Sequence, residues 1–222
     1  MPEDKSLIEI KSIWPKTAPN INNVSKYVLK YKNELIVIKY GGNVLIDRNV
    51  FNNFIQDIFI LNKLGLSVVV VHGGGPRIEK ELRKKKIESK FLNGLRVTDE
   101  NVIKIVENVL IDFNNDIVSS LNKKGPKAVS INSKTNNIIS IVPDRQELGF
   151  VGVPYKINTD LIKNILSKSQ IPVVAPLGLD ANNLTYNING DTAASAIAKK
   201  LKSRRLILMT NVEGVYDDRK NL

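Results

Sequence analysis

The chain has 222 residues, of which 42% are apolar and 25% are charged, a composition typical of a globular domain with its own core. It contains no cysteine, which excludes disulfides, thiolate nucleophiles and cysteine-bound metals. The longest apolar run, near residues 66–71, is far shorter than the roughly 18 residues that span a bilayer. Residues 1–20 lack the apolar segment of a secretory signal, so we expect a cytoplasmic protein.

The formal net charge of +11 raises the question of a polyanionic partner, because basic proteins attract nucleic acids and anionic membranes. The lysines are spread along the whole chain, however, and only residues 83–86 form a tight basic cluster. No aromatic residues interleave with that cluster. We therefore expect a solvated basic surface, with neither a nucleic acid nor a membrane as partner.

From about residue 35 onward, apolar strand-like runs alternate with helical patterns. Residues 35–38 predict a buried strand, and Asp47 is the expected N-cap of a helix that Gly65 ends. Residues 67–71 predict a second strand, and Pro76 suits the first turn of the helix after it. Such alternation is typical of an α/β fold with an open, mainly parallel sheet sandwiched between helices.

The remaining elements continue the alternation. The longest predicted helix opens at Thr98 and ends at Gly125. Two strands, 127–131 and 138–142, are separated by polar residues that favour a hairpin-like excursion. The pattern then predicts, in order, a helix at 159–169, a strand at 171–176, a loop at 187–191, a helix at 192–202 and a strand at 205–209.

Two glycine clusters, at residues 41–42 and 73–75, each follow an apolar strand and precede a helix. In a parallel sheet both would lie at the carboxyl ends of their strands, where ligands bind. Glycine lets backbone N–H groups approach an anion closely, and a helix N-terminus favours negative charge. Neither cluster matches the Rossmann or P-loop motif. The pattern therefore predicts a phosphate or carboxylate site, although glycine in a tight turn is also often structural.

Five segments carry a resemblance to a known family. They are V-I-K-Y-G-G-N, V-V-V-H-G-G-G-P, N-G-L-R-V-T-D, N-I-N-G-D-T-A-A and T-N-V-E-G-V. Their order and approximate spacing resemble the amino acid kinase family, and residues 93–99 resemble its N-acetylglutamate kinase branch. The resemblance covers roughly residues 24–217. It implies an amino acid kinase-like fold and ATP-dependent phosphorylation of the side-chain carboxylate of N-acetylglutamate, a step of arginine biosynthesis, with Mg²⁺ bound with the nucleotide.

The resemblance also assigns roles to residues. It implies that Lys39 stabilises the transition state and that Asp191 holds the catalytic lysines in place. It implies a substrate and phosphoryl-transfer site made of Gly42, Gly74, Gly75, Arg96 and Asn187, in which Arg96 and Asn187 hold the substrate carboxylates. It places the nucleotide-binding segment at Asn211, Val212, Glu213, Gly214, Val215 and Tyr216. No metal held by the protein alone is implied.

Simple chemistry agrees with this assignment. A carboxylate substrate is ionised at neutral pH, so its phosphorylation needs no general base, and we interpret His72 as structural. The planar guanidinium of Arg96 suits a carboxylate, although a buried structural arginine is the alternative. Without the resemblance, Lys39 would be interpreted as a solvated residue at the end of a strand. Asp191 could also be the N-cap of the helix at 192–202.

The resemblance divides the chain into three parts. Residues 1–34 would be an extension with a short helix, 35–177 the acetylglutamate-binding lobe and 178–222 the start of a nucleotide-binding lobe. Family members continue past the last motif with a second catalytic lysine, so we expect this lobe to be incomplete and the fold truncated at the C-terminus. The apolar stripe within residues 24–32 resembles the amino-terminal helix of a hexameric branch. A homo-oligomer is expected, either a dimer or a hexamer.

Two alternatives remain open at this stage. One is a related amino acid kinase that acts on another carboxylate. The other is a non-catalytic chain that binds an acyl-amino acid.

Overall fold

The computed structural model describes residues 10–12, 14–16, 18–23, 30–41 and 47–210. Gly42 and the predicted nucleotide segment 211–216 lie outside the described residues, as does most of the expected helix at 24–32. None of the helices in the described ranges is both long enough and apolar enough to cross a membrane.

A central sheet of five parallel strands organises the chain, in the order β11-β1-β2-β8-β5. These strands are β1 (Leu35–Tyr40), β2 (Ser67–His72), β5 (Ala128–Ile131), β8 (Ile171–Val174) and β11 (Arg205–Met209). Apolar residues dominate β1, β2 and β8, and most of them are buried, as expected for strands covered on both faces. The predicted open parallel sheet is therefore confirmed.

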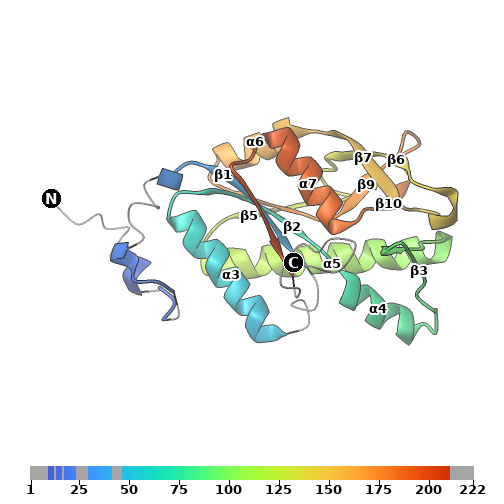
Figure 1. Ribbon diagram of the computed structural model, residues 1–222, viewed down its shortest axis with the longest axis horizontal. Coiled ribbons are helices and arrows are strands. Elements are labelled where there is room, and N and C mark those ends of the chain that lie inside the picture. The colour runs from blue at the N-terminus through green and yellow to red at the C-terminus, as the bar shows by residue number, and fades with distance from the viewer. Residues whose placement is uncertain (1–9, 13, 17, 24–29, 42–46, 211–222) are drawn as a thin grey trace, which may run out of the picture.

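Helices cover both faces of this sheet (Figure 1). They are α3 (Arg48–Lys63), α4 (Gly75–Lys84), α5 (Glu100–Lys124), α6 (Thr159–Ser167) and α7 (Gly190–Leu201). In Figure 1, α3 and α5 lie below the sheet, whereas α6 and α7 lie above it. Three sequence signals for the helix ends are confirmed, because Asp47 caps α3, Pro76 lies in the first turn of α4 and Gly125 ends α5. The start expected at Thr98 is wrong, because α5 begins at Glu100 and Asp99 is its N-cap.

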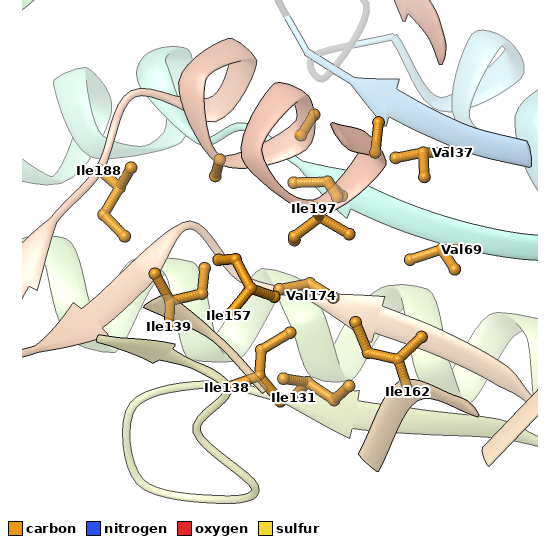
Figure 2. Close-up of a cluster of buried hydrophobic side chains, with 14 of the residues drawn as sticks. Val37, Val69, Ile131, Ile138, Ile139, Ile157, Ile162, Val174, Ile188 and Ile197 are labelled. Carbon is orange, nitrogen blue, oxygen red and sulfur yellow. The ribbon is translucent and has the colours of Figure 1, made fainter. Parts of the chain in front are cut away.

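The side chains of β1 alternate between the two halves of the core. Ile36, Ile38 and Tyr40 pack with apolar residues of α3 and α5. Val37 belongs to the opposite cluster, which contains Val69, Val174 and the apolar residues of α6 and α7 and is drawn in Figure 2. Because side chains alternate along a strand, Lys39 lies on the same face as Val37, toward α7.

A second, four-stranded sheet has the order β10-β9-β6-β7. Its strands are β6 (Ile139–Pro143), β7 (Gly152–Ile157), β9 (Leu177–Leu179) and β10 (Thr185–Asn187), and a 3₁₀ turn, η2 (Gln146–Leu148), lies between β6 and β7. Ile139, Ile141 and Ile157 of this sheet join the same cluster as Val37. Figure 2 shows Ile139 and Ile157 facing Ile197 of α7.

The expected hairpin between 127–131 and 138–142 is wrong. β5 pairs with β8 in the central sheet, whereas β6 pairs with β7 and β9 in the second sheet. The polar connection does turn, since the Asn132 side chain accepts from the N–H groups of Lys134 and Thr135. Ile131 and Ile138 at its two ends are both buried in the cluster of Figure 2. Burial of each strand on a different sheet therefore outweighs local pairing across the turn.

Candidate active site

Lys39 lies near the carboxyl end of β1 and is only 9% exposed. Its Nζ lies 3.0 Å from Oδ1 of Asp191, which stands in the first turn of α7 with about half of its side chain exposed. The ion pair thus joins the central sheet to the helix above it. A buried lysine stem with its charged end at a cavity wall is a preorganised positive charge, which is what stabilises an anionic transition state.

The N-cap interpretation of Asp191 is wrong. α7 begins at Gly190, and Asn189 is its N-cap, with a side-chain oxygen that accepts from the N–H groups of Asp191 and Thr192. Asn caps a helix as well as Asp does, so Asn189 satisfies the terminal N–H groups by itself. The carboxylate of Asp191 is consequently available to pair with Lys39.

The glycines next to Lys39 provide room for its side chain. A Cβ at Gly41 would collide with the Nζ and Cε atoms of Lys39, and a Cβ at Gly190 would lie 3.4 Å from the same Cε. Gly73 lies behind them, where a Cβ would be 3.4 Å from the Cα of Gly41. The sequence prediction explained such glycines by contact with an anion. At Gly41 the structure gives a further reason, since the lysine itself fills the space.

Gly74 and Gly75 stand at the N-terminus of α4. Gly74 is buried, and a Cβ there would collide with the side chain of Leu110. Gly75 is different, because nothing lies within 4 Å of the position that its Cβ would take. The N–H groups and the helix dipole at this end both attract a negatively charged group. Gly74 therefore packs against α5, and Gly75 borders open space.

A short hairpin carries Arg96. Its strands are β3 (Phe91–Leu92) and β4 (Leu95–Arg96), and Asn93 and Gly94 between them have φ values of 50° and 77°. Two central residues with positive φ define a type I′ turn, for which Asn-Gly is the preferred pair. This hairpin was not among the elements predicted from the sequence, although the Asn-Gly pair is a signal that could have predicted it.

Arg96 is 8% exposed, and most of its contacts are polar. Its guanidinium donates to the Glu79 carboxylate at 3.3 Å and to the Ser89 hydroxyl, and it lies 4.7 Å from the centre of the Phe91 ring. A weaker contact of 3.5 Å reaches the carbonyl oxygen of Gly75. Burial lowers the pKa of Arg96 from its usual value, while Glu79 opposes that shift. Glu79 thus holds the guanidinium beside the start of α4.

Thr98 connects the two residues predicted to hold substrate carboxylates. It is fully buried, and its hydroxyl donates to the carbonyl oxygen of Arg96 at 2.8 Å. The hydroxyl oxygen of Thr98 in turn accepts from Nδ2 of Asn187 at 3.4 Å. The backbone N–H of Asn187 also donates to the carbonyl of Phe150. Sequence reasoning took Thr98 only as the start of a helix and missed this link.

A cavity of about 680 Å³ brings the predicted residues together. Its lining includes Lys39, Gly74, Gly75, Arg96, Asn187 and Asp191. Lys80 and Arg83 add two further positive charges to its wall, against the negative charges of Glu79 and Asp191. The volume lies within the range of small-molecule sites, and the charge balance of the lining favours an anionic ligand.

Comparison with known proteins identifies the family of this chain. The sequence profile described as "Amino acid kinase family" matches residues 34–222. The chain belongs to this family. An acetylglutamate kinase of Pelagibacter ubique is 50% identical over 96% of this chain and 74% of that protein. The acetylglutamate kinase of Ruegeria pomeroyi is 42% identical over 91% of the chain and 71% of that protein.

Solved structures share the fold of this amino acid kinase. The protein smu.665 from Streptococcus mutans matches with a TM-score of 0.72 and 33% identity, over 83% of this chain and 75% of that one. N-acetylglutamate synthase from Neisseria gonorrhoeae, solved with coenzyme A and N-acetylglutamate, matches with a TM-score of 0.77 over 90% of this chain and 47% of that one. At 21% identity, the synthase supports the fold alone.

Proposed function

We propose that this protein catalyses the ATP-dependent phosphorylation of the side-chain carboxylate of N-acetyl-L-glutamate to N-acetylglutamyl 5-phosphate, a step of arginine biosynthesis. The observation that carries the proposal is the single cavity lined both by the Lys39–Asp191 pair and by Arg96. Relatives named acetylglutamate kinase, at 50% and 42% identity, support the choice of substrate.

The main barrier to this reaction is charge repulsion. The acceptor carboxylate is ionised at neutral pH and must approach a phosphate chain of the same sign. Lys39 would offset the charge that develops on the transferring group, and the N–H groups of Gly74 and Gly75 would donate to its oxygens. Asp191 would keep the Lys39 ammonium in place. No side chain has to remove a proton, so the site needs no general base.

Arg96 and Asn187 would hold the substrate. The contact between the Arg96 guanidinium and the Glu79 carboxylate supports this role, because the planar fork that pairs with one carboxylate can pair with another. A substrate carboxylate would share or replace that contact. The Nδ2 of Asn187 donates to Thr98, and no partner for its side-chain oxygen is found among the described residues, so that oxygen would accept from a ligand. The hydrogen bonds through Thr98 would couple the positions of Arg96 and Asn187.

ATP would enter from the edge where β1 and β11 end side by side. Tyr40 pairs with Met209 at this edge, and the predicted nucleotide segment, 211–216, follows directly in sequence. Within the described ranges there is no group of three His, Asp or Glu residues that could hold a metal ion. A Mg²⁺ ion held by nucleotide phosphates needs only one or two carboxylates from the protein, and Asp191 would be one of them. When bound with the nucleotide, Mg²⁺ would neutralise part of the phosphate charge.

We further propose that the protein is a cytoplasmic homo-oligomer, a dimer or a hexamer. The support is the apolar stripe of residues 24–32 and its resemblance to a hexameric branch. Light scattering at several protein concentrations would measure the assembled mass. A single species of monomer mass at all concentrations would contradict this part of the proposal.

Calorimetry and product trapping would test the function. N-acetylglutamate and a non-hydrolysable ATP analogue are titrated separately, and hydroxylamine traps the acyl phosphate formed with ATP and Mg²⁺. We expect binding of both ligands and trapped product with N-acetylglutamate, but not with N-acetylaspartate or free glutamate. Product from a different carboxylate would instead indicate a related kinase. Binding of N-acetylglutamate without any binding of nucleotide would indicate a non-catalytic protein.

A further inference from the structure

His72, the only histidine in the sequence, ends β2 and is fully buried directly before Gly73. Its Nδ1 lies 2.8 Å from the carbonyl oxygen of Gly73, and its Nε2 lies 3.1 Å from Nδ2 of Asn114. Asn114 is also fully buried, and the same Nδ2 donates to the carbonyl oxygen of Val173 at 2.9 Å. A continuous chain of polar contacts therefore runs from β8, through α5, to the glycine loop.

The two carbonyl oxygens at the ends of this chain fix the hydrogen positions along it. A carbonyl oxygen only accepts, so the Asn114 amide must turn its NH₂ group, not its oxygen, toward Val173. The second hydrogen of that NH₂ then points at His72 Nε2, which must accept and so carries no proton. The proton of a neutral imidazole consequently sits on Nδ1 and is donated to Gly73. Burial lowers the pKa of His72 to about 4, so the ring is neutral near pH 7.

The position of the Gly73 carbonyl determines where the next N–H points. No cis peptide bond occurs in the described residues, and in a trans peptide the C=O and N–H bonds point in opposite directions. His72 draws the Gly73 oxygen toward the buried interior. The N–H of Gly74 must therefore point away from His72. Gly73 and Gly74 both line the cavity, and among the described residues no acceptor is found for this N–H.

We propose that His72 is a positioning residue whose Nδ1–H holds the Gly73–Gly74 peptide so that the Gly74 N–H faces the cavity, with Asn114 selecting the imidazole tautomer. The catalytic meaning of this role rests on the proposed function, because the Gly74 N–H would donate to the transferring phosphoryl group. We call the hydrogen bond from His72 Nδ1 to the Gly73 carbonyl the clamp. Without it, the peptide between Gly73 and Gly74 could rotate and present its carbonyl oxygen to the cavity instead. An oxygen there would repel the anion that the site must bind.

The alternative is a histidine that only fills space, and two substitutions separate these roles. In His72→Asn the side-chain NH₂ takes the place of Nδ1 and keeps the donor to Gly73. In His72→Gln the amide reaches the position of Nε2 and the donor at Nδ1 is lost. Asn is the smaller side chain and leaves the larger void, so a space-filling role makes His72→Asn the worse variant. The clamp makes His72→Gln the worse one.

Nuclear magnetic resonance on the full chain tests the clamp directly. Labelling with ¹⁵N-histidine gives a single ring, and we expect a protonated Nδ1 and an unprotonated Nε2 at pH 7. The residual dipolar coupling of the Gly74 N–H reports the orientation of its peptide. That coupling should be the same in the unsubstituted protein and in His72→Asn, and it should change in His72→Gln. A proton on Nε2, or an equal Gly74 coupling in all three proteins, would overturn the proposal.

Product trapping measures the effect of the clamp on catalysis. We expect His72→Gln to lower kcat by about tenfold or more while the KM for N-acetylglutamate changes less than about twofold, and His72→Asn to keep most of the rate. A larger loss in His72→Asn, in line with a lower melting temperature, would show a space-filling histidine. If the unsubstituted protein forms no acyl phosphate, the proposed function fails, whereas the tautomer and the Gly74 coupling still decide whether the clamp exists.

Discussion

Replacing Lys39 by Met tests the centre of the proposed mechanism. Methionine keeps the volume of the stem that passes Gly41 and Gly190, so the packing around β1 should survive. Asp191 loses its partner, but about half of that side chain is exposed, and water can take over its solvation. We therefore expect a small effect on stability, within about 1 kcal/mol, as for a partly exposed ion pair.

The expected effect on catalysis is much larger. A unit charge about 4 Å from a phosphoryl oxygen contributes about 4 kcal/mol at an effective dielectric constant near 20. Asp191, at 3.0 Å from the Lys39 Nζ, offsets part of that energy. Loss of one electrostatic stabiliser usually costs about 10²–10³-fold in kcat, and the offset places Lys39→Met near 10²-fold. The KM for N-acetylglutamate should change little, since the charge acts mainly in the transition state.

The assay is hydroxylamine trapping at saturating and subsaturating N-acetylglutamate, with Lys80→Met as the matched control. Lys80 lines the same cavity but is exposed, so its charge is screened by solvent. We expect Lys80→Met to lower kcat less than about threefold, on the same screening argument. The reasoning is refuted if Lys39→Met loses no more activity than Lys80→Met.

Further substitutions probe the rest of the site. Arg96→Lys should weaken N-acetylglutamate binding but not nucleotide binding in calorimetry, because lysine keeps the charge without the planar fork; equal loss of both would indicate a structural arginine. Gly75→Ala should leave the melting temperature unchanged yet weaken N-acetylglutamate binding, whereas Gly74→Ala should lower the melting temperature, because its methyl group meets Leu110. His72 should make stability fall with acidity between pH 6.5 and about 4, because its folded pKa is depressed to about 4 and the unfolded chain binds the proton first. At pH 5 this is worth about 2 kcal/mol in urea unfolding, and His72→Asn should lack that share of the pH dependence.

The central sheet could be predicted from the sequence because its strands are buried on both faces. Such strands appear as short apolar runs, and the two in β1 and β2 end in glycine turns that mark the ligand edge. The N-cap at Asp47 and the stop at Gly125 are local signals, and both were confirmed. Features that depend on residues adjacent in sequence, such as buried strands and helix caps, could therefore be predicted.

The second sheet could not be predicted in the same way. β9 and β10 have three residues each, and β7 exposes Val153 and Tyr155, so neither length nor periodicity marks them as strands. β9 pairs with β10 and β6 pairs with β7 across short connections, whereas β5 pairs with the distant strand β8, and the hairpin expected between β5 and β6 failed for that reason. The contact of Arg96 with Glu79 was equally hidden, because a hairpin and a helix from different parts of the chain bring the two together.

The position of Lys39 shows how the fold and the site depend on the same constraint. Its neighbours Ile38 and Tyr40 point to the opposite face, where the Tyr40 ring stacks on Phe54 with 4.0 Å between ring centroids. Burial raises the pKa of Tyr40 to about 12, so this ring stays neutral and anchored in the core. A shift of β1 by one residue would bring the lysine into that apolar cluster and Tyr40 into the cavity. The apolar residues that stabilise the sheet therefore also select the face on which the Lys39 charge appears, the charge that we propose acts in catalysis, and β1 cannot lose its register without losing both.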